Sequence, residues 1–250
     1  MRISFFLLAG ALVPGVGFAQ SPASVVPLRP WSLGANPLVV LAISTQQTGQ
    51  AAGTALLTGG PAFEGFGRYE RPDARWYAEL AAGMGLYAAH KYDAAPEVGR
   101  SGSSTLLGFR TAARAGYALP LGRAGYWRLR PHAGLTLARL APGQSGRYDP
   151  QPLIYNNPAA GQTQQFETVT FGLRLGYEAG LVLGRRLGPD HATELGLTVR
   201  YANSLSGRAV ASTTFRYDRA GVPQPDIRSI SRLEAVMIGL SLSRPLRARS

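Results

Sequence analysis

The chain of 250 residues contains no cysteine, which excludes disulfide bonds, thiol catalysis and thiolate metal sites. Only 16% of its residues are charged and 45% are hydrophobic, a balance that argues against a charge-rich disordered chain. Lysine is almost missing as well, since Lys91 is the single one and arginine carries the net charge of +12. With 31 glycines and 18 prolines, the composition also argues against a coiled coil or a helix-rich globule.

The first nineteen residues predict a cleaved secretory signal. Arg2 supplies a positive start, and an apolar run follows over Ile3–Val13. Small residues, Gly17 and Ala19, then occupy positions −3 and −1 of a cut before Gln20. An uncleaved anchor helix is the alternative interpretation, but the apolar stretch is short. We therefore expect a signal peptide at 1–19.

The mature segment, 20–250, has no run of about 18 uninterrupted apolar residues, so a membrane-spanning helix is not expected in it. An exported chain of this kind can still span a membrane as a closed β-barrel, because a barrel satisfies its own backbone hydrogen bonds. No linker or second domain is visible, and 20–250 is expected to be one barrel domain.

Hydrophobic residues alternate with small or polar ones in several segments. In Thr168–Leu183, the odd positions are apolar, whereas the even positions are small, polar or charged except at the end. A period of two places these sets on opposite faces of a β-strand. Similar patterns predict eight strands, at about 31–45, 56–70, 75–92, 105–119, 126–141, 166–184, 192–206 and 230–246.

The predicted connections alternate between short turns and longer segments rich in Gly, Pro, Ser, Asn and Gln. The short ones lie near 71–74, 120–125 and 185–191, and the longer ones near 46–55, 93–104, 142–165 and 207–229. This alternation is typical of an outer-membrane barrel with its long loops outside the cell. We predict an all-β fold, an eight-stranded antiparallel up-and-down transmembrane barrel with both termini on the periplasmic side.

The composition of the two strand faces favours a membrane barrel over a soluble one. A soluble barrel would need a charged outer face, but the polar face here is mostly Gly, Ala and Thr, which suits a narrow interior. Aromatic residues fall near the predicted strand ends, as expected for rings at the two membrane interfaces. The predicted girdle residues are Trp31, Trp76, Tyr117 and Trp127 on the periplasmic side, and Phe109, Phe171 and Tyr201 toward the outside.

With its signal segment, its eight alternating segments and a last strand over Val236–Ser243, the chain resembles the small outer-membrane barrels of the OmpX type and the membrane domain of the OmpA type. It is most similar to the outer-membrane β-barrel domain common in Bacteroidetes-like bacteria. The resemblance implies a location in the cell outer membrane and contact with the barrel assembly machinery. Many such barrels end on an aromatic residue, whereas this chain has Leu246 followed by 247–250.

The inward face of the predicted barrel carries more arginine than acid. Because buried ions are costly unless they are paired, we expect an interlocked network that fills the lumen. An anion-selective passage is the alternative, although eight strands leave little room for water. The predicted lumen residues are Glu79, Arg110, Arg114, Arg128, Arg130, His132, Arg174, Glu178, Glu194 and Arg200.

Outside contacts are expected at the rim and at the two longest loops. Arg68 and Arg232 are predicted near the outer rim, where a guanidinium group could bind lipopolysaccharide phosphate. The loops 142–165 and 207–229 are candidate sites for an extracellular or envelope protein partner. Candidate contacts in the first loop are Tyr148, Tyr155, Asn156 and Asn157, with unstructured padding as the alternative.

Catalytic and cofactor sites find little support in the sequence. None of the three histidines lies two residues before a serine on a strand, and His90 with Asp93 is the best remaining pair. No cluster of His, Asp or Glu has metal-ligand spacing, and no glycine-rich loop opens a helix to hold a phosphate. The arginines are scattered rather than gathered, so nucleic acid is not an expected partner. We expect no enzyme activity, no cofactor and no metal.

The function predicted from sequence is that of an outer-membrane barrel with a filled polar lumen, acting as a structural or surface-loop binding module. A second hypothesis is an accessory of secretion or envelope assembly, which the resemblance to PorT-like barrels implies. A third is a lipid-modifying barrel enzyme or a narrow anion-selective pore.

Overall fold

A computed structural model describes residues 30–50, 53–71, 75–93, 101–122, 125–140, 153–157, 161–169, 172–187 and 193–246. The predicted signal peptide and Tyr148 lie outside these residues, as does Phe171. Among the described residues, no helix is long and apolar enough to cross a bilayer.

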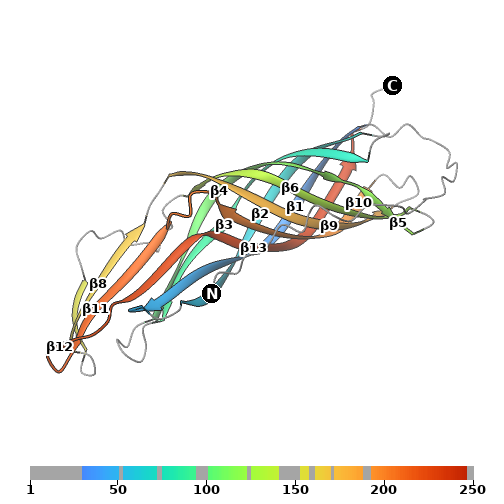
Figure 1. Cartoon of the computed structure of the whole chain (residues 1–250). Coiled ribbons are helices and arrows are strands. Elements are labelled where there is room, and N and C mark those ends of the chain that lie inside the picture. The colour runs from blue at the N-terminus through green and yellow to red at the C-terminus, as the bar shows by residue number, and fades with distance from the viewer. Residues whose placement is uncertain are drawn as a thin grey trace.

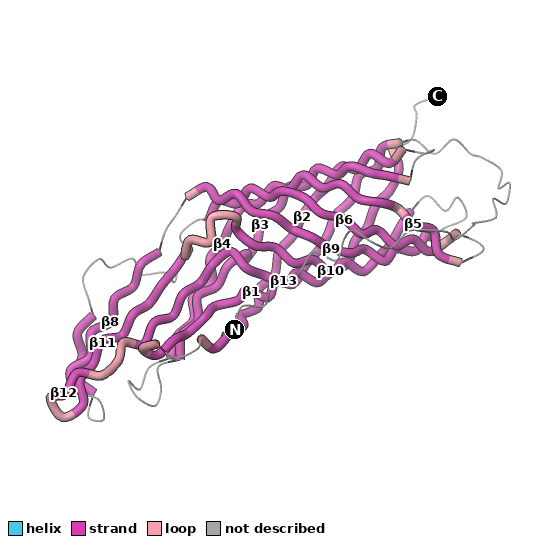
Figure 2. The backbone as a smooth tube through the Cα atoms, in the orientation of Figure 1, coloured by secondary structure: helices cyan, strands magenta, loops and turns pink. Residues whose placement is uncertain are grey.

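Eight long strands form a closed antiparallel barrel (Figures 1 and 2). Each strand pairs with the next, and pairing of the first with the last closes the ring. The predicted eight-stranded fold is therefore confirmed. Around the barrel the strands are β1 (Trp31–Thr48), β2 (Thr54–Glu70), β3 (Trp76–Asp93), β4 (Ser101–Tyr117), β6 (Trp127–Leu140), β9 (Leu173–Leu187), β10 (Thr193–Ser204) and β13 (Ile227–Pro245).

The two ends of the barrel differ. At one end, which we call the turn end, β2 leads into β3 and β9 into β10 through short connections, and β1 begins beside the last residues of β13. The short strand β5 (Leu119–Leu121) pairs with β6 at this end. The opposite end, which we call the loop end, carries the longer connections. This arrangement matches the alternation of connection lengths expected from the sequence.

The strands are strongly staggered around the ring. The pairing can be followed from Leu175 on β9 through β6, β4, β3, β2, β1, β13 and β10, and it returns to β9 at Arg185, ten residues further along. A closed sheet with such a stagger has strands inclined to the barrel axis by roughly 35–45°. The resulting interior is wide enough for side chains and little else.

At the loop end, an extension of the sheet continues beyond the barrel (Figure 1). It is built from β7 (Leu153–Asn157), β8 (Gly161–Val169), β11 (Ala211–Arg219) and β12 (Val222–Pro223), and β11 pairs with the first residues of β13. The prediction of irregular loops over 142–165 and 207–229 was therefore wrong for these strands. Their sequences are short and rich in polar residues, and the alternation of β11, with Ala211 and Phe215 on its buried face, is weaker than that of the barrel strands.

The predicted single strand at 166–184 was also wrong, because it is interrupted. β8 ends at Val169 and β9 begins at Leu173. Both keep one register against the neighbouring chain, since Ala211 pairs with Val169 and Ser204 with Gly176. The same register is therefore kept on both sides of Gly172, which belongs to neither strand.

Alternation along each strand separates an apolar outer face from a polar interior. Leu80 and Leu173, which point outward, expose 70% and 65% of their surface, whereas the inward Glu64 exposes 1%. Exposed large apolar side chains occur on all eight barrel strands, and buried Arg, Glu, Ser and Thr side chains line the inside. This is the reverse of a soluble protein, in which charge faces water and apolar groups form the core.

Candidate functional site

The barrel interior holds a connected set of buried ion pairs. Eight of the ten predicted lumen residues belong to it, and three further residues on β2 join them. We call this set the lumen cluster; its members are Glu64, Arg68, Glu70, Glu79, Arg110, Arg114, Arg128, Arg130, Glu178, Glu194 and Arg200. Six guanidinium groups thus face five carboxylates.

Glu64 on β2 lies at the centre of the cluster. Arg114 Nη2 donates to its Oε2 at 2.6 Å, and Arg200 Nη1 donates to its Oε1 at 2.8 Å. Asn36 Nδ2 donates to the same Oε1 at 2.9 Å. One carboxylate therefore connects β1, β2, β4 and β10 across the interior.

The cluster continues through Arg114, to Glu79 toward the turn end and to Glu178 and Arg110 toward the loop end. Its Nη1 lies 2.5 Å from Glu79 Oε1, and its Nε donates to Glu178, which also pairs with Arg110. All three nitrogen atoms of the Arg114 guanidinium group therefore bind carboxylates. Such complete pairing is what makes burial of an arginine tolerable.

Toward the turn end, the cluster continues from Arg68 to Arg128. Arg68 Nη2 lies 2.8 Å from Glu79 Oε2, and Arg68 Nη1 lies 4.0 Å from Glu194 Oε1. Arg130 pairs with Glu194, and its Nη2 lies 3.1 Å from Glu70 Oε2. Arg128 also pairs with Glu70 and is the last member of the cluster in this direction. Charges of opposite sign thus alternate along the lumen.

Inward glycines provide the space for these large side chains. A Cβ atom at Gly180 would lie 2.4 Å from Arg200 Cγ and 2.8 Å from His132 Nε2, and one at Gly184 would lie 2.6 Å from Glu194 Oε1. A strand residue with a side chain at either position would collide with the cluster. The repeated glycines on the polar face are therefore a packing requirement of the cluster.

Two predicted lumen residues stay outside the ion pairs. His132 is buried, and its Nδ1 lies 3.4 Å from the carbonyl oxygen of Arg130. Arg174 lies nearer the loop end, where its Nη2 donates to the carbonyl oxygen of Ala209 at 3.4 Å.

The prediction for Arg68 at the outer rim was wrong. Its side chain is 3% exposed and lies in the lumen near the turn end, because β2 runs toward that end. Sequence reasoning also missed Asn36, Glu64 and Glu70. The signal was present, since Glu64, Arg68 and Glu70 share one parity on β2 with the buried Phe66.

The predicted girdle residues of the turn end gather on the outer surface there. Trp31, Trp76, Tyr117 and Trp127 are all exposed, and Tyr69 stacks edge-on against Trp31 and tilted against Trp76. Arg185 lies over the Trp127 ring at 5.6 Å. Toward the loop end, the side chain of Phe109 is exposed and the ring of Tyr201 packs near Tyr177.

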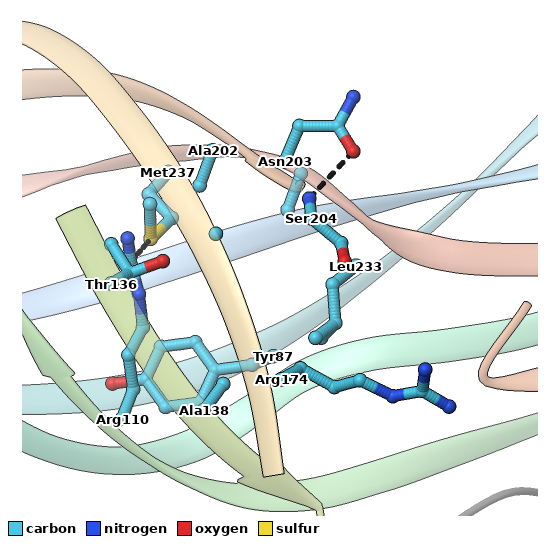
Figure 3. Close-up of a pocket in the computed structure, with 12 residues that line it drawn as sticks. Tyr87, Arg110, Thr136, Ala138, Arg174, Ala202, Asn203, Ser204, Leu233 and Met237 are labelled. Carbon is cyan, nitrogen blue, oxygen red and sulfur yellow. Dashed lines mark hydrogen bonds between the residues drawn. The ribbon is translucent and has the colours of Figure 1, made fainter. Parts of the chain in front are cut away.

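Above the lumen cluster, the interior opens into a cavity of about 360 Å³, its mouth included (Figure 3). Tyr87, Arg110 and Met237 line it toward the cluster, and Arg174 and Ser204 line it near the start of β9 and the end of β10.

The part of the chain that the structure describes contains no group of three or more His, Asp or Glu placed to hold a metal ion. The side chains of His90 and Asp93, the best catalytic pair from sequence, lie outside the described residues, as do those of Tyr155, Asn156 and Asn157.

Comparison with solved structures gives alignments of low sequence identity over most of the chain. No protein-family model and no curated protein matches the chain. The outer membrane protein OprG from Pseudomonas aeruginosa aligns over 88% of this chain and 98% of its own, with 12% identity and a TM-score of 0.48. Neisserial surface protein A aligns over 87% and 97%, with 11% identity and a TM-score of 0.40. Ail, the attachment invasion locus protein of Yersinia pestis, aligns over 86% and 99%, with 10% identity and a TM-score of 0.34.

Proposed function

We propose that the chain is an outer-membrane β-barrel protein of a Gram-negative envelope, with a lumen closed by ion pairs and a loop-end extension that binds partners at the cell surface. The observation that carries this proposal is the inverted arrangement of the barrel, with an apolar exterior and charges buried inside.

The height of the apolar surface supports a bilayer-spanning role. On β9, outward apolar side chains run from Leu173 to Leu183, and Arg185 follows them. At a rise of about 3.4 Å per residue and a tilt of about 45°, this stretch covers about 24 Å of the barrel axis. Outer-membrane barrels carry an apolar band about 25 Å tall.

The aromatic residues of the turn end support the same orientation. Exposed Trp and Tyr rings at one edge of an apolar band suit the headgroup region, where a ring contacts both hydrocarbon and water. With both the start of β1 and the end of β13 at this edge, the turn end faces the periplasm and the loop end faces outward.

The lumen cluster supports a structural role for the barrel and argues against conduction. Its carboxylates and guanidinium groups bind one another across the interior, so an ion would have to break several buried pairs to pass. The outward extension is then the part available for recognition. Polar strands such as β8 and β11 suit a surface exposed to water, on which a rigid barrel holds variable loops.

The test is to fold the mature chain into planar bilayers and record current. We expect no stable ion-selective steps, and the protein should migrate differently in detergent gels before and after heating. A variant with Arg114→Ala and Glu178→Ala removes two paired side chains beside Glu64 and serves as the conducting control. Stable steps from the unmodified protein, or a folded monomer in buffer without surfactant, would contradict the proposal.

A further inference from the structure

Three arginines lie at the loop-end edge of the apolar outer surface, and we call Arg139, Arg208 and Arg232 the rim arginines. Arg139 on β6 pairs in register with Leu173, the first residue of β9, which exposes 65% of its surface. The residues on either side of Arg139 along β6 are buried, so the alternation of the strand points Arg139 outward. Its side chain therefore lies at the level where the apolar surface ends.

The other two rim arginines lie on the far side of β9. Leu205, which exposes 55% of its surface, donates from its backbone N to the carbonyl oxygen of Leu175 at 3.0 Å and continues the apolar edge beyond β10. Arg208 follows it in the next exposed residues. Arg232 on β13 donates from Nε to the carbonyl oxygen of Gly207 at 2.9 Å, which holds its guanidinium group beside the backbone of Arg208.

The rim arginines carry charge that no acid compensates. Within the described residues, none of the three forms an ion pair with Asp or Glu. Glu234, two residues from Arg232 on β13, instead accepts a hydrogen bond from the Tyr201 hydroxyl at 2.9 Å. The buried arginines of the lumen cluster, by contrast, bind carboxylates. The surplus of positive charge at the rim favours an anionic partner.

The surface next to the rim arginines on the barrel side is apolar and aromatic. Phe109 pairs in register with Arg139 and exposes 54% of its surface. The rings of Tyr177 and Tyr201 lie 6.5 Å apart, close to the exposed Leu205. An anion bound here would lie directly beside a surface suited to hydrocarbon. A phosphorylated lipid meets both conditions, because its phosphate is joined directly to the part that carries the acyl chains.

We propose that the rim arginines bind the phosphate groups of a lipopolysaccharide molecule in the outer leaflet. The planar fork of a guanidinium group matches two phosphate oxygens, and the acyl chains pack on Leu173, Leu205 and Phe109. The choice of lipopolysaccharide rests on the proposed function, in which the loop end faces the outside of a Gram-negative cell. The rim thereby gains a lipid partner that is distinct from any partner of the extension.

Bisphosphorylated lipid A is a suitable probe, and lipid A without its two phosphates is the uncharged counterpart with the same acyl chains. We expect saturable binding of the bisphosphorylated form to the mature barrel in a nonionic detergent, measured by native mass spectrometry. The dephosphorylated form should bind at least about tenfold more weakly, because it cannot form charge-assisted hydrogen bonds with the arginines. The absence of saturable binding, or equal binding of the two forms, would overturn the proposal.

A triple variant of the rim arginines locates the site. It combines Arg139→Gln, Arg208→Gln and Arg232→Gln, and it should weaken binding of bisphosphorylated lipid A by about tenfold or more. Heat-dependent gel migration shows whether this variant folds. If it does not, Arg208→Gln alone, outside the strands, should weaken binding by about threefold. Unchanged binding in the folded triple variant, or in Arg208→Gln where that variant is needed, would refute the site.

A matched control removes three other exposed arginines at the loop end, farther from the apolar surface. It combines Arg216→Gln, Arg219→Gln and Arg228→Gln and should leave binding within about twofold. An equal loss in this control would show general attraction of charge and would exclude a defined site. All these measurements are made in detergent. Failure to bind lipid A in a barrel that stays non-conducting and heat-modifiable would therefore overturn the lipid site and leave the proposed function intact.

Discussion

Glu64 on β2 and Arg114 on β4 are 50 residues apart in sequence, yet they pair inside the barrel with 2.6 Å between Oε2 and Nη2. Each side chain is 1% exposed. Arg114 also binds Glu79 and Glu178, so this pair lies at the junction of several strands. Interaction at this junction makes the cluster a single unit, whose members are expected to respond together to substitution.

Glu64→Gln should destabilise the barrel strongly. The change keeps the side-chain shape but leaves Arg114 and Arg200 without the charge that compensates their burial. We expect a loss of about 3–5 kcal/mol in the free energy of unfolding, measured by urea titration in lipid vesicles. Asp226→Asn removes the exposed Arg216–Asp226 pair and should cost less than about 1 kcal/mol. Equal losses of stability in the two variants would show that the ion pairs of the lumen cluster contribute no more than an exposed pair.

Gly180→Ala tests the packing requirement of the lumen. The added Cβ would lie 2.4 Å from Arg200 Cγ and 2.8 Å from the carbonyl oxygen of Val199, so the backbone or the cluster must shift. We expect a destabilisation of about 1–3 kcal/mol. Gly172→Ala is the matched control, because no atom lies within 4 Å of its added Cβ, and it should change stability by less than about 0.5 kcal/mol. The result would contradict the packing argument if both substitutions were neutral.

Leu135→Arg tests which face contacts lipid. Leu135 points outward from β6 with 56% of its surface exposed, within the apolar surface. In a bilayer the substitution should cost about 2–4 kcal/mol, whereas on a water-facing surface it would cost almost nothing. Val222→Arg, on the exposed β12 of the extension, should be nearly neutral in the same vesicles. A neutral Leu135→Arg would exclude a membrane-spanning barrel.

Arg68→Gln and Arg232→Gln are expected to differ in their effect on the stability of the barrel. Arg68 is buried against Glu79, so its loss should destabilise the barrel by about 3–5 kcal/mol. Arg232 makes an exposed hydrogen bond to the carbonyl of Gly207, so its loss should cost about 1 kcal/mol or less. Unfolding midpoints in urea distinguish the two outcomes. Similar midpoints for both variants would conflict with the buried position of Arg68.

Local sequence pattern was sufficient for most of the barrel. Segments such as Thr193–Ser204 alternate so regularly that each residue could be assigned to the outer or inner face. The charged members of the lumen cluster on β4, β6, β9 and β10 followed from the same parity. Strand β2 was harder, because Gly59, Gly60 and Pro61 interrupt its alternation, and the acidic and basic side chains beyond them were not recognised as inward.

The extension at the loop end could not be predicted in this way. β8 and β11 are short and rich in polar residues, so the alternation of β11, which buries Ala211 and Phe215 on one face, is too weak to mark a strand. These strands form because β13 continues past the barrel and offers its edge to β11, which then pairs with β8. That pairing joins residues far apart along the chain.

The period-two alternation of side chains was enough to specify an eight-stranded barrel with a polar interior. The sequence of each strand by itself shows which of its two faces is apolar and which is polar. The partners of each buried charge and the cavity beside Arg174 depended on the stagger of each strand against its neighbours. Closure of the sheet sets that stagger once for the whole ring, so it is a property of the assembled barrel rather than of any single strand.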